Sequence, residues 1–152
     1  PVPVVGALNG PAVAGGVEIA LSCDLRIAHE SAYLRPRGLD WGAVSCSRLS
    51  RYLPIGFTTQ LVWLQQKLPA AEALRWGLVT EVVASQDVLI EKAMALAQRL
   101  AAYPTDAVLR SRELLRNLAD SWSRMMALQA AATDAGWASD PQAAREALRK
   151  GK

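Results

Sequence analysis

The order of apolar and polar positions along the chain predicts an α/β protein. Residues 2–8 are almost wholly apolar and run into the turn sequence Asn-Gly-Pro at 9–11, which indicates a buried strand ending in a turn. The apolar stretch 17–23 follows two glycines and predicts a short buried helix. Residues 24–30 alternate polar and apolar, as a half-buried strand does, and residues 32–34 extend or pair with it. Strand, helix and strand in this order are typical of a βαβ unit.

The pattern becomes helical after a loop. Residues 35–47 contain Pro36, Gly38 and Gly42 without a sustained period, which predicts a loop that could carry binding residues. One more strand is expected at 78–83. The expected helices span 48–53, 56–66, 70–76, 87–102, 105–119, 122–135 and 142–150.

We therefore divide the chain into an α/β core at 1–84 and a helical region at 85–152. The apolar stripes of the helical region exceed what a small α/β unit can cover. They include Leu109, Leu115, Trp122 and Met126. Burial of these side chains favours self-association.

Composition and charge narrow the class of protein. Apolar residues make up 51% of the chain and charged residues 20%, which is typical of a folded globular protein. The net charge of +3 comes from basic residues interleaved with acids, so no nucleic-acid partner is expected. The chain has two cysteines, outside any Cys-x-x-Cys pair, and one histidine, which argues against a metal site. No apolar run approaches the ~18 residues of a membrane span, and we expect a cytoplasmic protein without a membrane partner.

Two ordered segments carry a resemblance. Residues 3–24 read PVVGALNGPAVAGGVEIALSCD, in which a strand ends at Asn-Gly and a Gly-Gly pair opens a helix that ends at Cys-Asp. Residues 73–83 read ALRWGLVTEVV. Both segments resemble the enoyl-CoA hydratase/isomerase (crotonase) family.

The resemblance implies a crotonase-like (ClpP/crotonase) fold, in which residues 1–84 form a partial core. Because the chain opens at Pro1 directly in an apolar strand, we expect the fold to be truncated on its N-terminal side. The helical region would then serve oligomerisation, as a homotrimer or hexamer. The implied partner is an acyl-CoA substrate, and no separate cofactor is expected because coenzyme A enters as part of the thioester.

The Gly-Gly pair suits stabilisation of an anionic oxygen. A thioester enolate places negative charge on the carbonyl oxygen, and backbone N–H groups at a helix N-terminus stabilise such a charge. The resemblance implies that Gly15 supplies one N–H of an oxyanion hole, and that Ala14 and Gly16 shape the turn against the substrate. The alternative is a Gly-Gly turn selected only for backbone geometry.

Glu18 is the candidate acid/base. It is the one ionisable side chain between Pro1 and Cys23, at the start of an otherwise apolar helix, and a buried carboxylate needs a partner or a function. The resemblance implies a general acid/base role. The alternative is a helix-start acid that bonds free N–H groups as in a capping box.

The loop departs from the family pattern. Many hydratases carry a second catalytic glutamate, and the same offset from Glu18 reaches Gly38 here. We expect Gly38 and Leu39 to line the substrate site. Asp40 is the one acid between Glu30 and Glu72, which makes it a candidate second catalytic carboxylate or a loop-surface cap.

Three functions remain open from the sequence. The first is an enoyl-CoA hydratase, isomerase or lyase that works through an enolate. The second is a non-catalytic acyl-CoA-binding or assembly subunit, which the missing glutamate motivates, and the third is a helical interaction module. Trp63 and Trp76 are expected in the core, and His29 is interpreted as structural.

Overall fold

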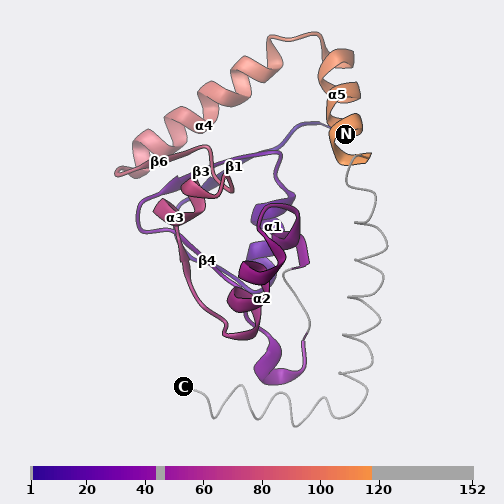
Figure 1. The fold of residues 1–152 in the computed structure, drawn as a ribbon. Coiled ribbons are helices and arrows are strands. Elements are labelled where there is room, and N and C mark those ends of the chain that lie inside the picture. The colour runs from indigo at the N-terminus through magenta and orange to yellow at the C-terminus, as the bar shows by residue number, and fades with distance from the viewer. Residues whose placement is uncertain (1, 44–46, 118–152) are drawn as a thin grey trace.

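The computed structural model describes residues 2–43 and 47–117, and its first sheet holds three parallel strands. These are β1 (Val5–Leu8), β3 (Leu25–His29) and β6 (Glu81–Val83), in the order β1-β3-β6 (Figure 1). Because β1 and β3 are parallel, a crossover must join them, and helix α1 lies on that crossover. The βαβ unit expected from the sequence is therefore confirmed.

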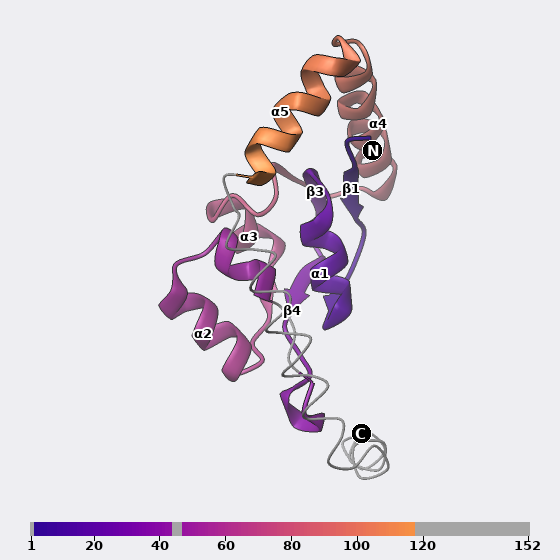
Figure 2. The ribbon, with the colours of Figure 1, turned by 90° about the vertical axis from the view of Figure 1, so that its right-hand side faces the viewer.

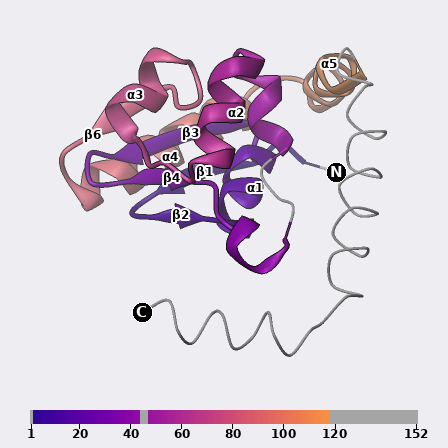
Figure 3. The same cartoon turned by 60° about the horizontal axis from the view of Figure 1, so that its bottom comes forward.

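A second sheet carries shorter strands. It consists of β2 (Ala12–Val13), β4 (Tyr33–Arg35) and β5 (Leu68–Pro69), with β2 parallel and β5 antiparallel to β4 (Figure 3). The chain passes from the first sheet to the second after β1 and again after β3, and it returns to the first sheet at β6. This alternation places the turn before α1 beside the end of β4.

The helices are distributed over both faces of the first sheet. In chain order they are α1 (Gly15–Ser22), the 3-10 helices η1 (Leu39–Trp41) and η2 (Ser47–Arg51), α2 (Ile55–Trp63), α3 (Ala70–Arg75), α4 (Gln86–Ala101) and α5 (Thr105–Asn117). Helix α4 packs across β1 and β3, while α1, α2 and α3 lie on the opposite side of the sheet (Figures 1 and 2).

Each face has its own apolar core. The larger cluster joins α1, η2, α2 and both sheets through fully or almost fully buried residues that include Val17, Leu34, Leu49, Leu61 and Leu78. The smaller cluster consists of Ile27, Val83 and Leu89 and lies under α4. Burying side chains of this size stabilises the fold by roughly 1.5 to 3 kcal/mol each.

Asp24, which follows α1, joins three segments of the chain. Asp24 accepts the backbone N–H of Val4 at 2.8 Å and the Nε of Arg112 at 2.9 Å, and Arg116 donates to it at 3.2 Å. The start of β1, the end of α1 and helix α5 therefore meet at one carboxylate.

The sequence missed the shortest elements. Strands β2 and β5 have two residues each, too few to show a period of two, and η1 lies within the expected loop. The helix expected at 48–53 is a 3-10 helix at Ser47–Arg51, and the strand expected at 78–83 begins only at Glu81. The helix expected at 105–119 is described up to Asn117, while the helices expected at 122–135 and 142–150 lie outside the described residues.

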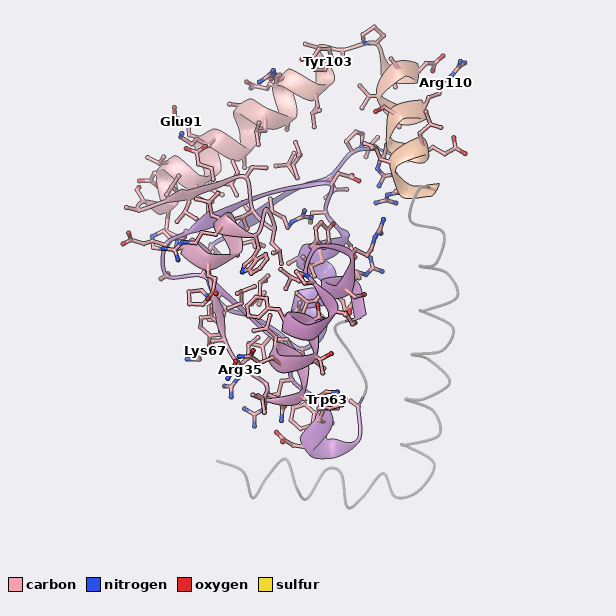
Figure 4. All side chains as sticks on the ribbon, in the orientation of Figure 1. Arg35, Trp63, Lys67, Glu91, Tyr103 and Arg110 are labelled. Atoms are coloured by element: carbon pink, nitrogen blue, oxygen red, sulfur yellow. The ribbon has the colours of Figure 1, made fainter. Side chains whose placement is uncertain are left out.

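The expectation that Trp63 and Trp76 are core residues is wrong. Trp63 is 72% exposed at the end of α2, where Figure 4 labels it at the periphery. Two residues correspond to roughly 200° around a helix, so Trp63 points away from the face on which Leu61 is buried. Trp76 is 40% exposed and stacks on Phe57 with ring centroids 5.1 Å apart.

The division into regions 1–84 and 85–152 stays a prediction. Within the described part of the chain, no helix is long and apolar enough to cross a membrane.

Candidate functional site

A strained turn opens helix α1. Ala14, the residue before the helix, has φ 50° and ψ −116°, a backbone conformation that residues other than glycine rarely adopt. Its N–H donates to the carbonyl oxygen of Arg35 at 3.0 Å, and its own carbonyl accepts the N–H of Val17 at 3.0 Å. Strand β4 and the first turn of α1 therefore fix this backbone from both sides.

Gly15 faces open space at the start of the helix. A Cβ added there would meet nothing within 4 Å, whereas one added at Gly16 would touch Ala12 at an ordinary 3.9 Å. As the first helical residue, Gly15 has an N–H with no acceptor inside the helix. That N–H lies at the positive end of the helix dipole, where backbone N–H groups can bind a negatively charged oxygen.

Glu18 lies one turn further along α1 and pairs with Arg48. Its Oε2 accepts the Nε of Arg48 at 2.7 Å, and its Oε1 lies 3.5 Å from the backbone N of Arg48. The two side chains are 16% and 21% exposed. The carboxylate therefore bonds a side chain of η2, and the capping-box alternative does not describe these contacts.

Ser22 completes this cluster. Its hydroxyl donates to the carbonyl oxygen of Glu18 at 2.6 Å and accepts the Nη1 of Arg48 at 2.7 Å. One guanidinium group thus spans the carboxylate and the hydroxyl one helical turn beyond it. The sequence analysis did not single out Arg48, because a lone arginine beyond a loop carries no spacing signal.

Gly38 occupies a backbone position that excludes a side chain. Its φ is 147°, and a Cβ there would lie 2.9 Å from the carbonyl oxygen of Ala43 and 3.2 Å from the Ala43 Cβ. Its N–H donates to the Oε1 of Gln65 at 3.3 Å. The conformation of this loop is therefore incompatible with a glutamate at position 38.

Asp40 is held within the same loop. Its Oδ1 accepts the Nε2 of Gln65 at 2.7 Å, its Oδ2 lies 3.4 Å from the Nη2 of Arg37, and its side chain is 49% exposed. These contacts give Asp40 a role in shaping the loop, and its catalytic role stays a prediction. The neighbouring Leu39 is 42% exposed.

Gln65 is a second residue that the sequence analysis missed. It adopts φ 49°, and besides its bonds to Gly38 and Asp40 its carbonyl oxygen accepts the Nε of Arg35 at 3.0 Å. A glutamine after an apolar helix gives no sequence signal for such a role.

His29 has the contacts of a structural residue. Its Nδ1 lies 2.7 Å from the hydroxyl of Ser31, and its Nε2 lies 3.1 Å from the carbonyl oxygen of Ala84. It therefore ties the end of β3 to the segment after β6. Among the residues that the structure describes, no group of His, Cys, Asp and Glu side chains could hold a metal ion.

The side chains of two basic residues near β4, Arg35 and Lys67, lie apart from the cluster of Glu18, Ser22 and Arg48. Arg35 and Lys67 project from the same side of the molecule in Figure 4, and the Nζ of Lys67 lies 4.6 Å from the centroid of the Tyr33 ring. An apolar cavity of about 380 Å³ lies elsewhere, between the start of β1 and helices α4 and α5. Neither Gly15 nor Glu18 lines that cavity, so its place in the fold does not mark the candidate site.

Comparison with known proteins assigns the chain to a family. The sequence profile of the enoyl-CoA hydratase/isomerase family matches residues 1–149. The short-chain-enoyl-CoA hydratase of Clostridium acetobutylicum is 38% identical over 117 residues, which cover 74% of this chain and 44% of that protein. The carnitinyl-CoA dehydratase of Salmonella typhi is 37% identical over 118 residues, covering 75% of this chain and 45% of its own length.

Solved structures share the fold. An enoyl-CoA hydratase from Mycobacterium tuberculosis superposes with a TM-score of 0.81 at 34% identity, covering 90% of this chain and 64% of that one. An enoyl-CoA hydratase/isomerase from Pseudoalteromonas atlantica gives a TM-score of 0.85 at 25% identity, covering all of this chain and 62% of that one. The chain thus spans less than half the length of the two sequence relatives, and it has the crotonase fold. With its profile match from end to end of the described residues, the chain belongs to the enoyl-CoA hydratase/isomerase family.

Proposed function

We propose that the protein carrying these residues is an enzyme that acts on an acyl-CoA thioester through an enolate. Gly15 donates its backbone N–H to the thioester oxygen, and Ala14 and Gly16 shape the turn that presents it. Glu18 exchanges a proton with the acyl chain or with water. The relatives named as an enoyl-CoA hydratase and a carnitinyl-CoA dehydratase support this class of substrate.

The supporting observation is the position of Glu18 relative to Gly15. The open N–H and the carboxylate lie one helical turn apart, because residues i and i+3 of a helix share one face. Charge that develops on the oxygen and a proton that moves at the neighbouring carbon require a hydrogen-bond donor and a base within reach of the same thioester. Gly38, Leu39 and Asp40 would then border the acyl chain from the loop.

Turnover of a panel of 2-enoyl-CoA and 3-hydroxyacyl-CoA thioesters by the complete protein tests the proposal. Glu18→Gln should lower turnover by about 100- to 10,000-fold and spare thioester binding, since the amide keeps the size of the side chain but cannot accept the proton. Glu91→Gln is the matched control, because Glu91 is an exposed acid on α4 (Figure 4). Unchanged turnover in Glu18→Gln contradicts the proposal.

The wild-type protein also distinguishes the second function. Saturable thioester binding without conversion of any panel member would favour the non-catalytic binding or assembly subunit, which the side-chain-free Gly38 motivates. Conversion of any member excludes it.

We also propose that the subunits assemble as a homotrimer or hexamer in the cytoplasm. Leu114 and Leu115 on α5 are each 66% exposed, and association would cover them. Sedimentation equilibrium of the complete protein tests the assembly, and a monomer at micromolar concentration contradicts it. Cell fractionation tests the location.

A further inference from the structure

Glu18 has one charged partner among the described contacts, and that partner is a cation. The Nε of Arg48 bonds Oε2 at 2.7 Å, while the Arg48 backbone N reaches Oε1 only at 3.5 Å. A carboxylate has about four acceptor positions on its two oxygens. The strong bond therefore occupies Oε2, and among the described contacts Oε1 keeps acceptor positions that a water molecule or a substrate hydrogen could use.

The guanidinium itself is fixed by a second bond. Nη1 of Arg48 donates to the hydroxyl of Ser22, which in turn donates to the carbonyl oxygen of Glu18. Because the guanidinium is planar and rigid, two bonds in different directions fix its orientation. Ser22 of helix α1 thereby orients Arg48, and Arg48 in turn holds Glu18 of the same helix.

Gly38 is the position at which the resemblance would place a second carboxylate. The backbone at Gly38 leaves no room for that side chain. The short bond from Arg48 therefore fixes Oε2, and Oε1 is the oxygen left to accept a proton.

We propose that Arg48 is a positioning residue that holds Oε2 of Glu18 and directs its Oε1 toward the substrate. The inference rests on the proposed function. In the step it serves, the C–H bond at the α-carbon breaks and the proton binds to Oε1 of Glu18. The electron pair of that bond forms the carbon–carbon double bond of the enolate, and the π pair of the carbonyl moves to the thioester oxygen, which the N–H of Gly15 stabilises.

Kinetics of the complete protein with Arg48→Ala, Arg48→Lys and Arg110→Ala test the proposal. Arg110 is an exposed arginine on α5 and serves as the matched control (Figure 4). Arg48→Ala should lower kcat by about 10- to 100-fold with KM nearly unchanged, in the range that coupled neighbours show. Arg48→Lys should recover part of kcat, and added guanidinium ion should partly restore Arg48→Ala.

The double variant Glu18→Gln/Arg48→Ala gives the sharpest readout. If Arg48 acts through Glu18, the double variant turns over no more slowly than Glu18→Gln alone. A further loss in the double variant, or a full kcat in Arg48→Ala, overturns the role of Arg48. If Glu18→Gln keeps full turnover, the proposed function itself fails, so the two failures are distinguishable.

Ser22→Ala keeps the test independent of folding. It removes one bond of the guanidinium and leaves the ion pair, so kcat should fall by less than about tenfold. Exchange of the α-hydrogen of a bound thioester in D₂O should fall in parallel. If the exchange rate is unchanged both in Ser22→Ala and in Arg48→Lys, the proposal is overturned.

Discussion

The start of α1 and the loop after β4 both contain glycines, but they use them in opposite ways. Gly15 has open space where a side chain would be, while Gly38 has the carbonyl oxygen of Ala43 only 2.9 Å from the same position. The first glycine leaves room for a ligand, and the second lets the chain fold against itself. A glycine that serves a site and one that serves a loop therefore look alike in sequence and differ in what surrounds them.

The two candidate acids, Glu18 and Asp40, also differ in what surrounds them. Glu18 bonds a partly buried arginine from a distant segment, whereas the partners of Asp40 include Arg37 in its own loop. An exposed ion pair of the second kind contributes little to stability. The comparison supports the proposed chemistry at the start of α1 and a shaping role for Asp40 in the loop, and four experiments can break or sharpen it.

The largest effect is expected from comparing Glu18→Gln with Asp40→Asn. Loss of a general base lowers turnover by about 100- to 10,000-fold, roughly 3 to 5 kcal/mol of activation free energy, so Glu18→Gln should reach this range. Asp40→Asn can still accept the amide of Gln65 and should lower turnover by less than about tenfold. Steady-state kinetics decide, and equal losses would give Asp40 a share in catalysis.

The second effect concerns stability. Gly38→Ala places a methyl group against Ala43 at a φ that favours glycine, and it should lower the free energy of unfolding by about 1 to 3 kcal/mol. Gly10→Ala is the matched control, because a Cβ at Gly10 meets nothing within 4 Å, and it should change stability by at most about 0.5 kcal/mol. Urea denaturation measures both. Equal stability of the two variants would mean that the loop adapts.

The sequence predicted the start of α1 better than the loop. The apolar run, the turn residues and the Gly-Gly pair are consecutive, so local pattern was enough to place Glu18 on a short helix that follows the Gly-Gly pair, although the helix begins at Gly15 and not at residue 17. The loop is held by Gln65 from the end of α2, and Glu18 is held by Arg48 from η2. Contacts between distant segments leave no period in the sequence, which is why both partners were missed.

The third experiment tests whether the open space at Gly15 serves ligand binding or folding. Gly15→Ala should leave the free energy of unfolding within about 0.5 kcal/mol of wild type, since its Cβ has no neighbour. If the thioester lies against this backbone, the methyl group should lower kcat/KM by about tenfold, or ~1.4 kcal/mol. Thermal unfolding and kinetics of one preparation measure both quantities. Unchanged kcat/KM would place the ligand elsewhere.

The smallest effect is expected at Ala14, where the two regions meet. Ala14→Gly removes a side chain from φ 50° and ψ −116° while keeping the N–H bond to Arg35. Relief of the strain outweighs the added freedom of glycine in the unfolded chain, so the free energy of unfolding should rise by about 1 kcal/mol. The midpoint of urea denaturation measures this change.

Ala71→Gly provides the matched control for that last change. Ala71 is an exposed residue of the regular helix α3, where the same substitution should lower the free energy of unfolding by about 0.5 to 1 kcal/mol. Opposite signs at the two alanines would locate the strain in the turn beside Gly15. A loss at both would mean that β4 and α1 hold the Ala14 backbone without strain, and the start of α1 would then be an ordinary turn.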